Sequence, residues 1–165
     1  MIYFDNSATT KMYPEVLDTY RKVNEQFFGN PSSLHRIGNE ADALLQQSRK
    51  QIAQLLAVQP DEIFFTSGGT ESDNWAIKGT AMEKFHAGKH MIASSVEHPA
   101  VSKSLEQLGK LGFEITYLPV DTDGIISVEE LGKAIRKDTI LVSVMAINNE
   151  VGSIQPRQPL KAHVF

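Results

Sequence analysis

The sequence predicts an α/β fold with a mostly parallel sheet, and three observations lead to that prediction. Short apolar segments alternate with longer, helix-periodic segments through most of the 165 residues. The segment 139–146 is apolar and rich in β-branched residues, which is typical of a parallel strand buried on both faces. The length suits a single domain, with 41% hydrophobic and 22% charged residues, as in ordinary globular chains.

The N-terminal third is expected to be an arm followed by two helices. Residues 1–13 form the arm, with a short strand at 2–4. A helix over 13–26 has Pro14 in its first turn, where the missing N–H is tolerated. A turn-rich loop then leads to a helix over 39–56, whose apolar residues recur near one face.

The middle of the chain alternates strictly. The pattern predicts a buried strand at 63–66, a helix over 70–86, a strand at 90–94, a helix from 99 to about 111 and a strand at 114–118. Each strand is followed by a polar or glycine-rich stretch. Because ligands in open α/β sheets bind at the carboxyl ends of strands, those stretches are the places to look for a site.

The C-terminal third is expected to hold a turn, a short helix and a last strand. The sequence Asp-Thr-Asp-Gly at 121–124 predicts a turn. A helix over 127–136 begins with Ser127 and has Glu130 three residues later, which fits a capping box. The strand over 139–146 follows.

Composition excludes several classes of partner. The net charge is -4 and no basic run is present, so we expect neither nucleic acid nor a membrane surface as a partner. No apolar stretch approaches the ~18 residues of a membrane helix, and the first residues lack the features of a signal peptide. The lack of cysteine excludes a disulfide framework but says little about compartment, and a cytoplasmic location is expected as the default.

The most informative motif is the glycine-rich turn that follows the segment 63–66. Ser67, Gly68 and Gly69 precede a helix that begins near Thr70. A strand, a glycine-rich turn and a helix N-terminus form an anion site, because free N–H groups and the helix dipole point at the ligand. The motif is neither a dinucleotide fingerprint nor a P-loop. The alternative is a plain turn in which Thr70 or Ser67 only caps the helix.

Two further polar segments follow strands. Glu97 and His98 come after strand 90–94, and Asn148 and Asn149 come after strand 139–146. Together with the glycine-rich turn they predict a cluster of phosphate-binding backbone, imidazole and amide. Singly, each has an ordinary alternative: a histidine before proline is more often a cap or surface residue, and an asparagine pair is more often turn chemistry.

No metal site is expected. His86 and His90 are four residues apart, but Gly88 interrupts the helix that would align them. The turn at 121–124 resembles the start of a calcium loop, yet Gly132 stands where the loop needs an acidic residue.

Five motifs in this order resemble the cysteine desulfurases, which are pyridoxal-phosphate enzymes of the class V aminotransferase group. The motifs are Asp5 to Thr10, Gly29 to Ser33 with His35, Thr66 to Asn74, Glu97-His98, and Asn148 to Gly152. The resemblance runs from about residue 2 to residue 156. It implies the large domain of fold type I, a three-layer α/β/α arrangement. In it, strands 90–94, 114–118 and 140–144 form a contiguous parallel group, and strand 63–66 lies at one end of the sheet.

The resemblance also implies roles for matching residues. Gly69 and Thr70 should hold the cofactor phosphate, His98 should stack on the pyridine ring and move a proton, and Asn149 should donate to the ring oxygen or the substrate. Imidazole suits both of its tasks because it is flat and titrates near neutral pH. Weaker roles near the mouth of the site fall to the loop residues Asn30, Ser32 and His35.

The implied reaction converts cysteine to alanine and an enzyme persulfide, which supplies iron–sulfur cluster assembly or tRNA thiolation. The family needs a catalytic cysteine and a Schiff-base lysine in a Ser-x-His-Lys setting, and this sequence has neither. We therefore expect an N-terminal portion of a desulfurase that is inactive alone. Alternatives are a non-catalytic module that binds pyridoxal phosphate or a partner, or a portion of a selenocysteine lyase or another class V enzyme.

The resemblance completes the expected organisation. It divides the chain into an arm (1–13), a partial cofactor-binding domain (14–156) and a divergent tail (157–165). Cysteine is the expected substrate, and a sulfur-acceptor protein is the expected partner. Because strand 63–66 would lack its antiparallel neighbour, we expect a marginally stable homo-oligomer, either dimeric or prone to aggregation.

Overall fold

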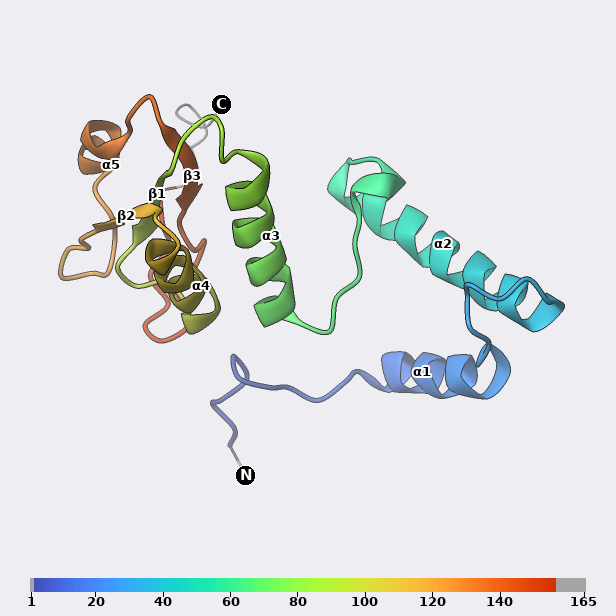
Figure 1. The fold of residues 1–165 in the computed structure, drawn as a ribbon. Coiled ribbons are helices and arrows are strands. Elements are labelled where there is room, and N and C mark those ends of the chain that lie inside the picture. Colours follow the sequence, from blue (N-terminus) through green and yellow to red (C-terminus); the bar gives the residue numbers. More distant parts are fainter. Residues whose placement is uncertain (1, 157–165) are drawn as a thin grey trace. The chain divides into compact units, whose positions relative to one another are not determined.

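The computed structural model describes residues 2–156, which divide into two compact units between Phe65 and Thr66 (Figure 1). The predicted tail at 157–165 lies outside the described residues. The predicted boundary at residue 13 stays a prediction. Each unit is described by itself.

The first unit is helical. Helix α1 spans Pro14–Gln26 and begins at the proline, as predicted. Helix α2 spans Arg36–Leu56 and is followed by a 3-10 turn, η1, at Pro60–Glu62. Helix α2 begins three residues earlier than predicted, because Nδ1 of His35 accepts a hydrogen bond from the Gly38 N–H at 3.2 Å and caps the helix.

The predictions of two strands in or next to this unit are wrong. Residues 2–4 form no strand; the Tyr3 hydroxyl instead donates to the carbonyls of Asp5 and Thr9. Residues 63–66 are also outside the sheet. The carbonyl of Ile63 accepts a bond from the Arg49 guanidinium, which also lies 5.1 Å from the centroid of the Phe65 ring. A strand needs a partner to bind its backbone groups, and no described strand pairs with this segment.

The second unit is built on a parallel sheet of three strands among the described residues. They are β1 (His90–Ser94), β2 (Glu114–Leu118) and β3 (Thr139–Ser143), in the order β2-β1-β3. The predicted contiguous parallel group is therefore confirmed. Strand β3 was expected to be buried on both faces, which is wrong: it lies at the sheet edge and is half-buried, whereas all of β1 is buried.

Helices cover both faces of this sheet, which confirms the three-layer arrangement. Helices α3 (Gly69–Glu83) and α4 (Pro99–Lys110) pack on one face, and α5 (Val128–Ala134) packs on the other (Figure 1). The two apolar cores alternate along β1, as strand geometry requires. Met91 and Ala93 face α3 and α4, and Ile92 faces Leu131 of α5.

The segment between β2 and β3 forms the predicted turn. Oδ1 of Asp121 accepts hydrogen bonds from the backbone N–H groups of Asp123 and Ile125, and Gly124 adopts φ +75°. Ser127 then caps α5 by accepting from the Glu130 N–H at 3.2 Å. The reciprocal half of the predicted capping box is replaced by a bond between the Glu130 carboxylate and Lys133.

Candidate functional site

The glycine-rich turn leads into a helix whose first backbone N–H groups are free to donate. Helix α3 begins at Gly69, one residue earlier than predicted, and the Ser72 N–H bonds back to the Gly68 carbonyl at 3.1 Å. The N–H groups of Gly69, Thr70 and Glu71 precede any possible intrahelical partner, and they make no bond to another described residue. These donors and the helix dipole favour an anion at this end of α3.

The turn itself is held by side chains around it. Oε2 of Glu71 accepts hydrogen bonds from the Ser67 N–H at 2.6 Å and the Ser67 hydroxyl at 2.7 Å. These two bonds, the backbone one first, lower the pKa of Glu71 below its ordinary value. On the other side of the turn, Thr66 Oγ1 lies 2.7 Å from Ser72 Oγ and donates to the Gly68 carbonyl.

The two glycines of the turn are not required by packing. A Cβ built on Gly68 or Gly69 would meet no atom within 4 Å. Both residues are exposed, and neither has a left-handed backbone. The protein's own fold therefore does not explain the pair. Glycine here leaves the side-chain positions beside the free N–H groups empty, which suits the close approach of a ligand to the backbone.

His98 stands at the start of α4, on the loop that follows β1. Its Nδ1 accepts a hydrogen bond from the Ala100 N–H at 3.1 Å, so the ring caps the helix. To accept that bond Nδ1 must be unprotonated, which places the proton of the neutral ring on Nε2. The ring is exposed. The ordinary alternative, a cap, is thus confirmed for Nδ1, while Nε2 and the ring face remain available for other contacts.

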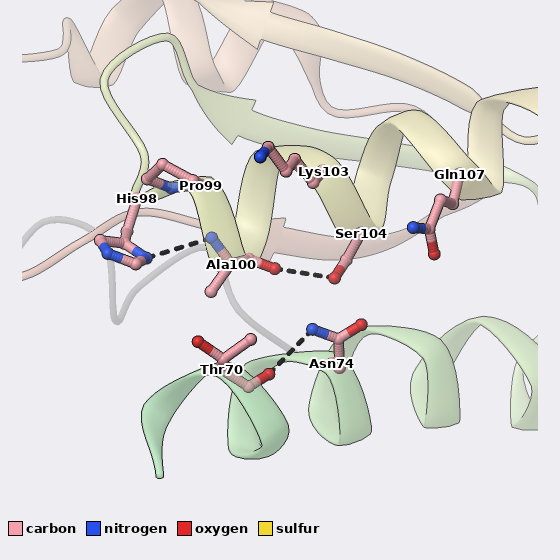
Figure 2. Close-up of a pocket in the computed structure, with 8 residues that line it drawn as sticks. All are labelled: Thr70, Asn74, His98, Pro99, Ala100, Lys103, Ser104 and Gln107. Carbon is pink, nitrogen blue, oxygen red and sulfur yellow. Dashed lines mark hydrogen bonds between the residues drawn. The ribbon is translucent and has the colours of Figure 1, made fainter.

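Thr70 and His98 come together at one pocket of about 360 Å³ between the N-terminal half of α3 and helix α4 (Figure 2). Its volume lies within the range of small-molecule sites. Figure 2 shows the ring of His98 and the side chain of Thr70 at the same end of the groove. Further lining residues come from both helices: Asn74, Pro99, Ala100, Lys103, Ser104 and Gln107. Lys103 adds a positive charge, which suits an anionic ligand.

The predicted amide does not line this pocket. Asn149 is exposed, and its Nδ2 donates to the Glu150 carboxylate at 3.1 Å. The neighbouring Asn148 is buried and organises the loop after β3, because its Oδ1 accepts from the N–H groups of Glu150 and Val151. Turn chemistry, the ordinary alternative, therefore describes Asn148.

The three loop residues with weaker expected roles have local structural contacts. Oδ1 of Asn30 accepts from the Ser32 N–H at 2.9 Å, and His35 caps α2. All three lie in the first unit, whereas the pocket lies in the second. Their roles near a site stay predictions.

Glu97 and Glu71 organise the site, although no local sequence signal marks either residue for that role. In the sequence Glu97 stands out only as the neighbour of His98, yet its carboxylate binds residues 46 and 48 positions away.

The described residues contain no group of acidic or histidine side chains that could hold a metal ion. Within the same residues no helix is long and apolar enough to cross a bilayer.

Comparison with known proteins decides the family. The sequence pattern of the family described as Aminotransferase class-V matches residues 2–164. The chain belongs to this family. Membership agrees with the resemblance on which the site residues were predicted, and the class V group depends on pyridoxal phosphate.

The curated relatives that this chain resembles include cysteine desulfurases. The class V chain is 59% identical over 156 residues to a "NifS/IcsS protein homolog" of Lactobacillus delbrueckii subsp. bulgaricus, covering 94% of this chain and 40% of the relative. It is 50% identical over 159 residues to "Cysteine desulfurase IscS" of Dictyoglomus turgidum, covering 96% and 40%. The chain thus spans about 40% of the length of the curated relatives it matches.

Solved structures confirm the fold class. A "NIFS-LIKE PROTEIN" superimposes with a TM-score of 0.90 at 43% identity, over 94% of this chain and 43% of that one. "SspA in complex with cysteine" also gives a TM-score of 0.90, at 37% identity, over 97% and 46%. The predicted assignment to the α/β fold of the pyridoxal-phosphate-dependent transferases is therefore correct.

Proposed function

We propose that this class V chain supplies the phosphate- and ring-binding part of a pyridoxal-phosphate-dependent cysteine desulfurase. The observation that carries the proposal is the pocket shared by Thr70 and His98 at the N-termini of α3 and α4. Family membership indicates which cofactor is bound, and the similarity to cysteine desulfurases indicates the class of substrate.

The residues present fit the cofactor in three respects. The free N–H groups of Gly69 and Thr70 and the Thr70 hydroxyl suit a phosphate. The open space at Gly68 and Gly69 allows that phosphate to approach the backbone. The flat ring of His98 lines the same pocket and can stack on an aromatic ring.

Bound pyridoxal phosphate supplies an electron sink that stabilises negative charge on an amino acid substrate. The chain's own residues bind and orient the cofactor. Gly69 and Thr70 anchor the phosphate, and His98 fixes the plane of the ring. Because Nδ1 is occupied by Ala100, Nε2 of His98 is the atom that holds or moves a proton. Asn149 is proposed as a further donor that reaches the site by rearrangement from its bond with Glu150.

Several wider expectations belong to this proposal. They are conversion of cysteine to alanine, transfer of sulfur to an acceptor protein for iron–sulfur cluster assembly or tRNA thiolation, a cytoplasmic location and a homodimer. The 165 residues alone should not release alanine from cysteine, because they contain no thiol to receive the sulfur. An alanine-release assay on the purified chain tests that point directly.

The binding proposal is tested by titrating the chain with pyridoxal phosphate and following its visible absorbance. Borohydride reduction and intact mass then separate site binding from adducts on surface lysines. We expect saturable binding that weakens about tenfold in the His98→Ala variant, since stacking and a helix cap are both lost. The matched control is His86→Ala, which alters an exposed histidine outside the pocket. Equal binding by both variants would contradict the proposal.

A further inference from the structure

The Glu97 carboxylate joins the ends of two neighbouring strands immediately before His98. Its Oε1 accepts hydrogen bonds from the Ser94 hydroxyl at 2.6 Å and the Met145 backbone N–H at 2.7 Å. Its Oε2 accepts a longer bond from the Ser143 hydroxyl at 3.4 Å. Ser94 is the last residue of β1 and Ser143 is the last of β3. One half-buried side chain therefore ties β1 to β3 at their carboxyl ends.

The two residues before Glu97 are tied to other parts of the sheet end. The Ser95 N–H donates to the Leu118 carbonyl at the end of β2, at 2.9 Å. The Val96 carbonyl accepts from Asn148 Nδ2 at 3.4 Å. Segment 95–97 is thus bound in succession to β2, to the loop after β3 and to the end of β3.

His98 is the first residue of this loop whose side chain bonds to a helix instead of to the sheet end. Its Nδ1 caps α4 at Ala100, and Pro99 between them has a fixed φ. The position of the ring is therefore set by two anchors, Glu97 on the sheet side and the first turn of α4 on the other. Adjacent Cα atoms are only ~3.8 Å apart, so a shift of Glu97 carries directly to His98.

We propose that Glu97 is a positioning residue, which holds the His98 imidazole at the mouth of the pocket by fixing the loop to β3. The inference rests on the proposed function, since it gives the ring of His98 a task there. Glu97 does not line the pocket, so its influence on a ligand there would act through His98.

The geometry defines a matched pair of substitutions. Both short bonds reach the same oxygen, Oε1. In Glu97→Gln the amide oxygen can accept both, while the amide nitrogen faces the Ser143 hydroxyl, which can accept. In Glu97→Ala all three bonds are lost. A positioning role predicts that glutamine rescues and alanine does not. The control is Glu83→Ala, an exposed carboxylate at the end of α3.

The first readout needs no cofactor. In the 15N-labelled 165-residue chain, the exchange rate of the Ala100 amide reports the His98 cap, and the ring 15N shifts of His98 report its tautomer. We expect Glu97→Ala to raise Ala100 exchange about fivefold, the factor that corresponds to loss of an N-cap. Glu97→Gln and Glu83→Ala should stay within about twofold, and the Leu131 amide on the far face should not change in any variant.

A second variant keeps the proposal testable if Glu97→Ala does not fold. Ser94→Ala removes one of the two short bonds at a buried position without adding volume. It should give a smaller rise in Ala100 exchange in the same direction. Unchanged Ala100 exchange and unchanged His98 shifts in both Glu97→Ala and Ser94→Ala would overturn the proposal, as would a Glu97→Gln variant that folds but behaves like alanine.

Binding of pyridoxal phosphate provides the second readout and separates the two proposals. If Glu97 positions His98, affinity should fall about tenfold in Glu97→Ala and recover in Glu97→Gln. Failure of the wild-type chain to bind would count against the proposed function alone, since the Ala100 result is obtained without cofactor. A wild-type chain that binds, with full affinity kept in Glu97→Ala, would overturn the role of Glu97.

Discussion

Glu71 holds Ser67 through both its backbone N–H and its hydroxyl, at 2.6 and 2.7 Å from the same carboxylate oxygen. These two bonds explain why an acidic side chain can lie beside a proposed phosphate site. Its charge is engaged with the turn, and the lowered pKa shows that the ionised form is favoured by those two bonds. Glu71 therefore organises the turn that presents the free N–H groups of Gly69 and Thr70.

Removing that carboxylate should weaken anion binding although a negative charge is lost. In Glu71→Ala the turn must be ordered when the ligand binds, so we expect affinity for pyridoxal phosphate to fall about tenfold. Glu71→Gln keeps an acceptor for Ser67 and should bind nearly as the wild type does. The titration used for His98 measures both. Tighter binding by Glu71→Ala would mean that repulsion by the carboxylate outweighs its support of the turn.

The buried His90 should make the stability of the second unit depend on pH. Nδ1 of His90 lies 2.7 Å from Thr139 Oγ1, and Nε2 lies 2.8 Å from Thr116 Oγ1, so the ring joins all three strands. Burial, and then the charge of Arg136, lower the pKa of His90. As pH falls, the unfolded chain therefore binds a proton before the folded one does. This contribution to stability is complete above pH ~6.5 and is lost as pH falls through that value toward the lower folded pKa.

Denaturant unfolding at pH 7.5, 6.5 and 5.5 measures this effect. The wild-type free energy of unfolding should fall between pH 6.5 and 5.5, and His90→Gln should show a smaller fall because it removes the titrating ring. His86→Gln is the control, since His86 is exposed. The same pH dependence in wild type and His90→Gln would refute this assignment.

Gly88 is required by a close backbone approach. A Cβ at this position would lie 2.1 Å from the carbonyl oxygen of Asp138, next to the start of β3. Gly88→Ala should therefore destabilise the unit by about 1–3 kcal/mol through overpacking. Gly132→Ala is the matched control, because nothing lies within 4 Å of its added Cβ, and alanine in a helix is favoured by roughly 0.5–1 kcal/mol. Thermal melts of both variants measure this difference. A Gly88→Ala variant with the melting temperature of the wild type would show that the close approach does not require glycine.

Local patterns predicted the sheet and its helices well because their signals lie within each segment. The apolar run of β1 and the proline at the start of α1 both specify structure without distant partners. The segment 63–66 looks like β1 in sequence but forms no strand, because a strand exists only where another strand pairs with it. The early start of α2 was missed because histidine is not among the residues usually preferred as N-caps.

The candidate site was predictable where one motif carries it and hidden where distant residues meet. The positions of Thr70 and His98 follow from the strand and helix pattern, and the structure brings both to one pocket, whereas the predicted Gly69 is not among the residues that line it. The bond from Glu97 to Met145 spans 48 residues and has no local signature. Gln155 is similar: its buried amide binds Ile126 and Gly124 across the turn, 29 and 31 residues away.

A 15N NMR titration of the chain with pyridoxal phosphate tests whether Gly69, Thr70 and His98 form one cofactor-binding site. If they do, the Gly69 and Thr70 amides and the His98 ring nitrogens should show saturable shifts with a common dissociation constant. Inorganic phosphate should reproduce the amide shifts but not the ring shifts. Shifts confined to lysine-rich surface positions, with Gly69, Thr70 and His98 unchanged at saturation, would contradict it.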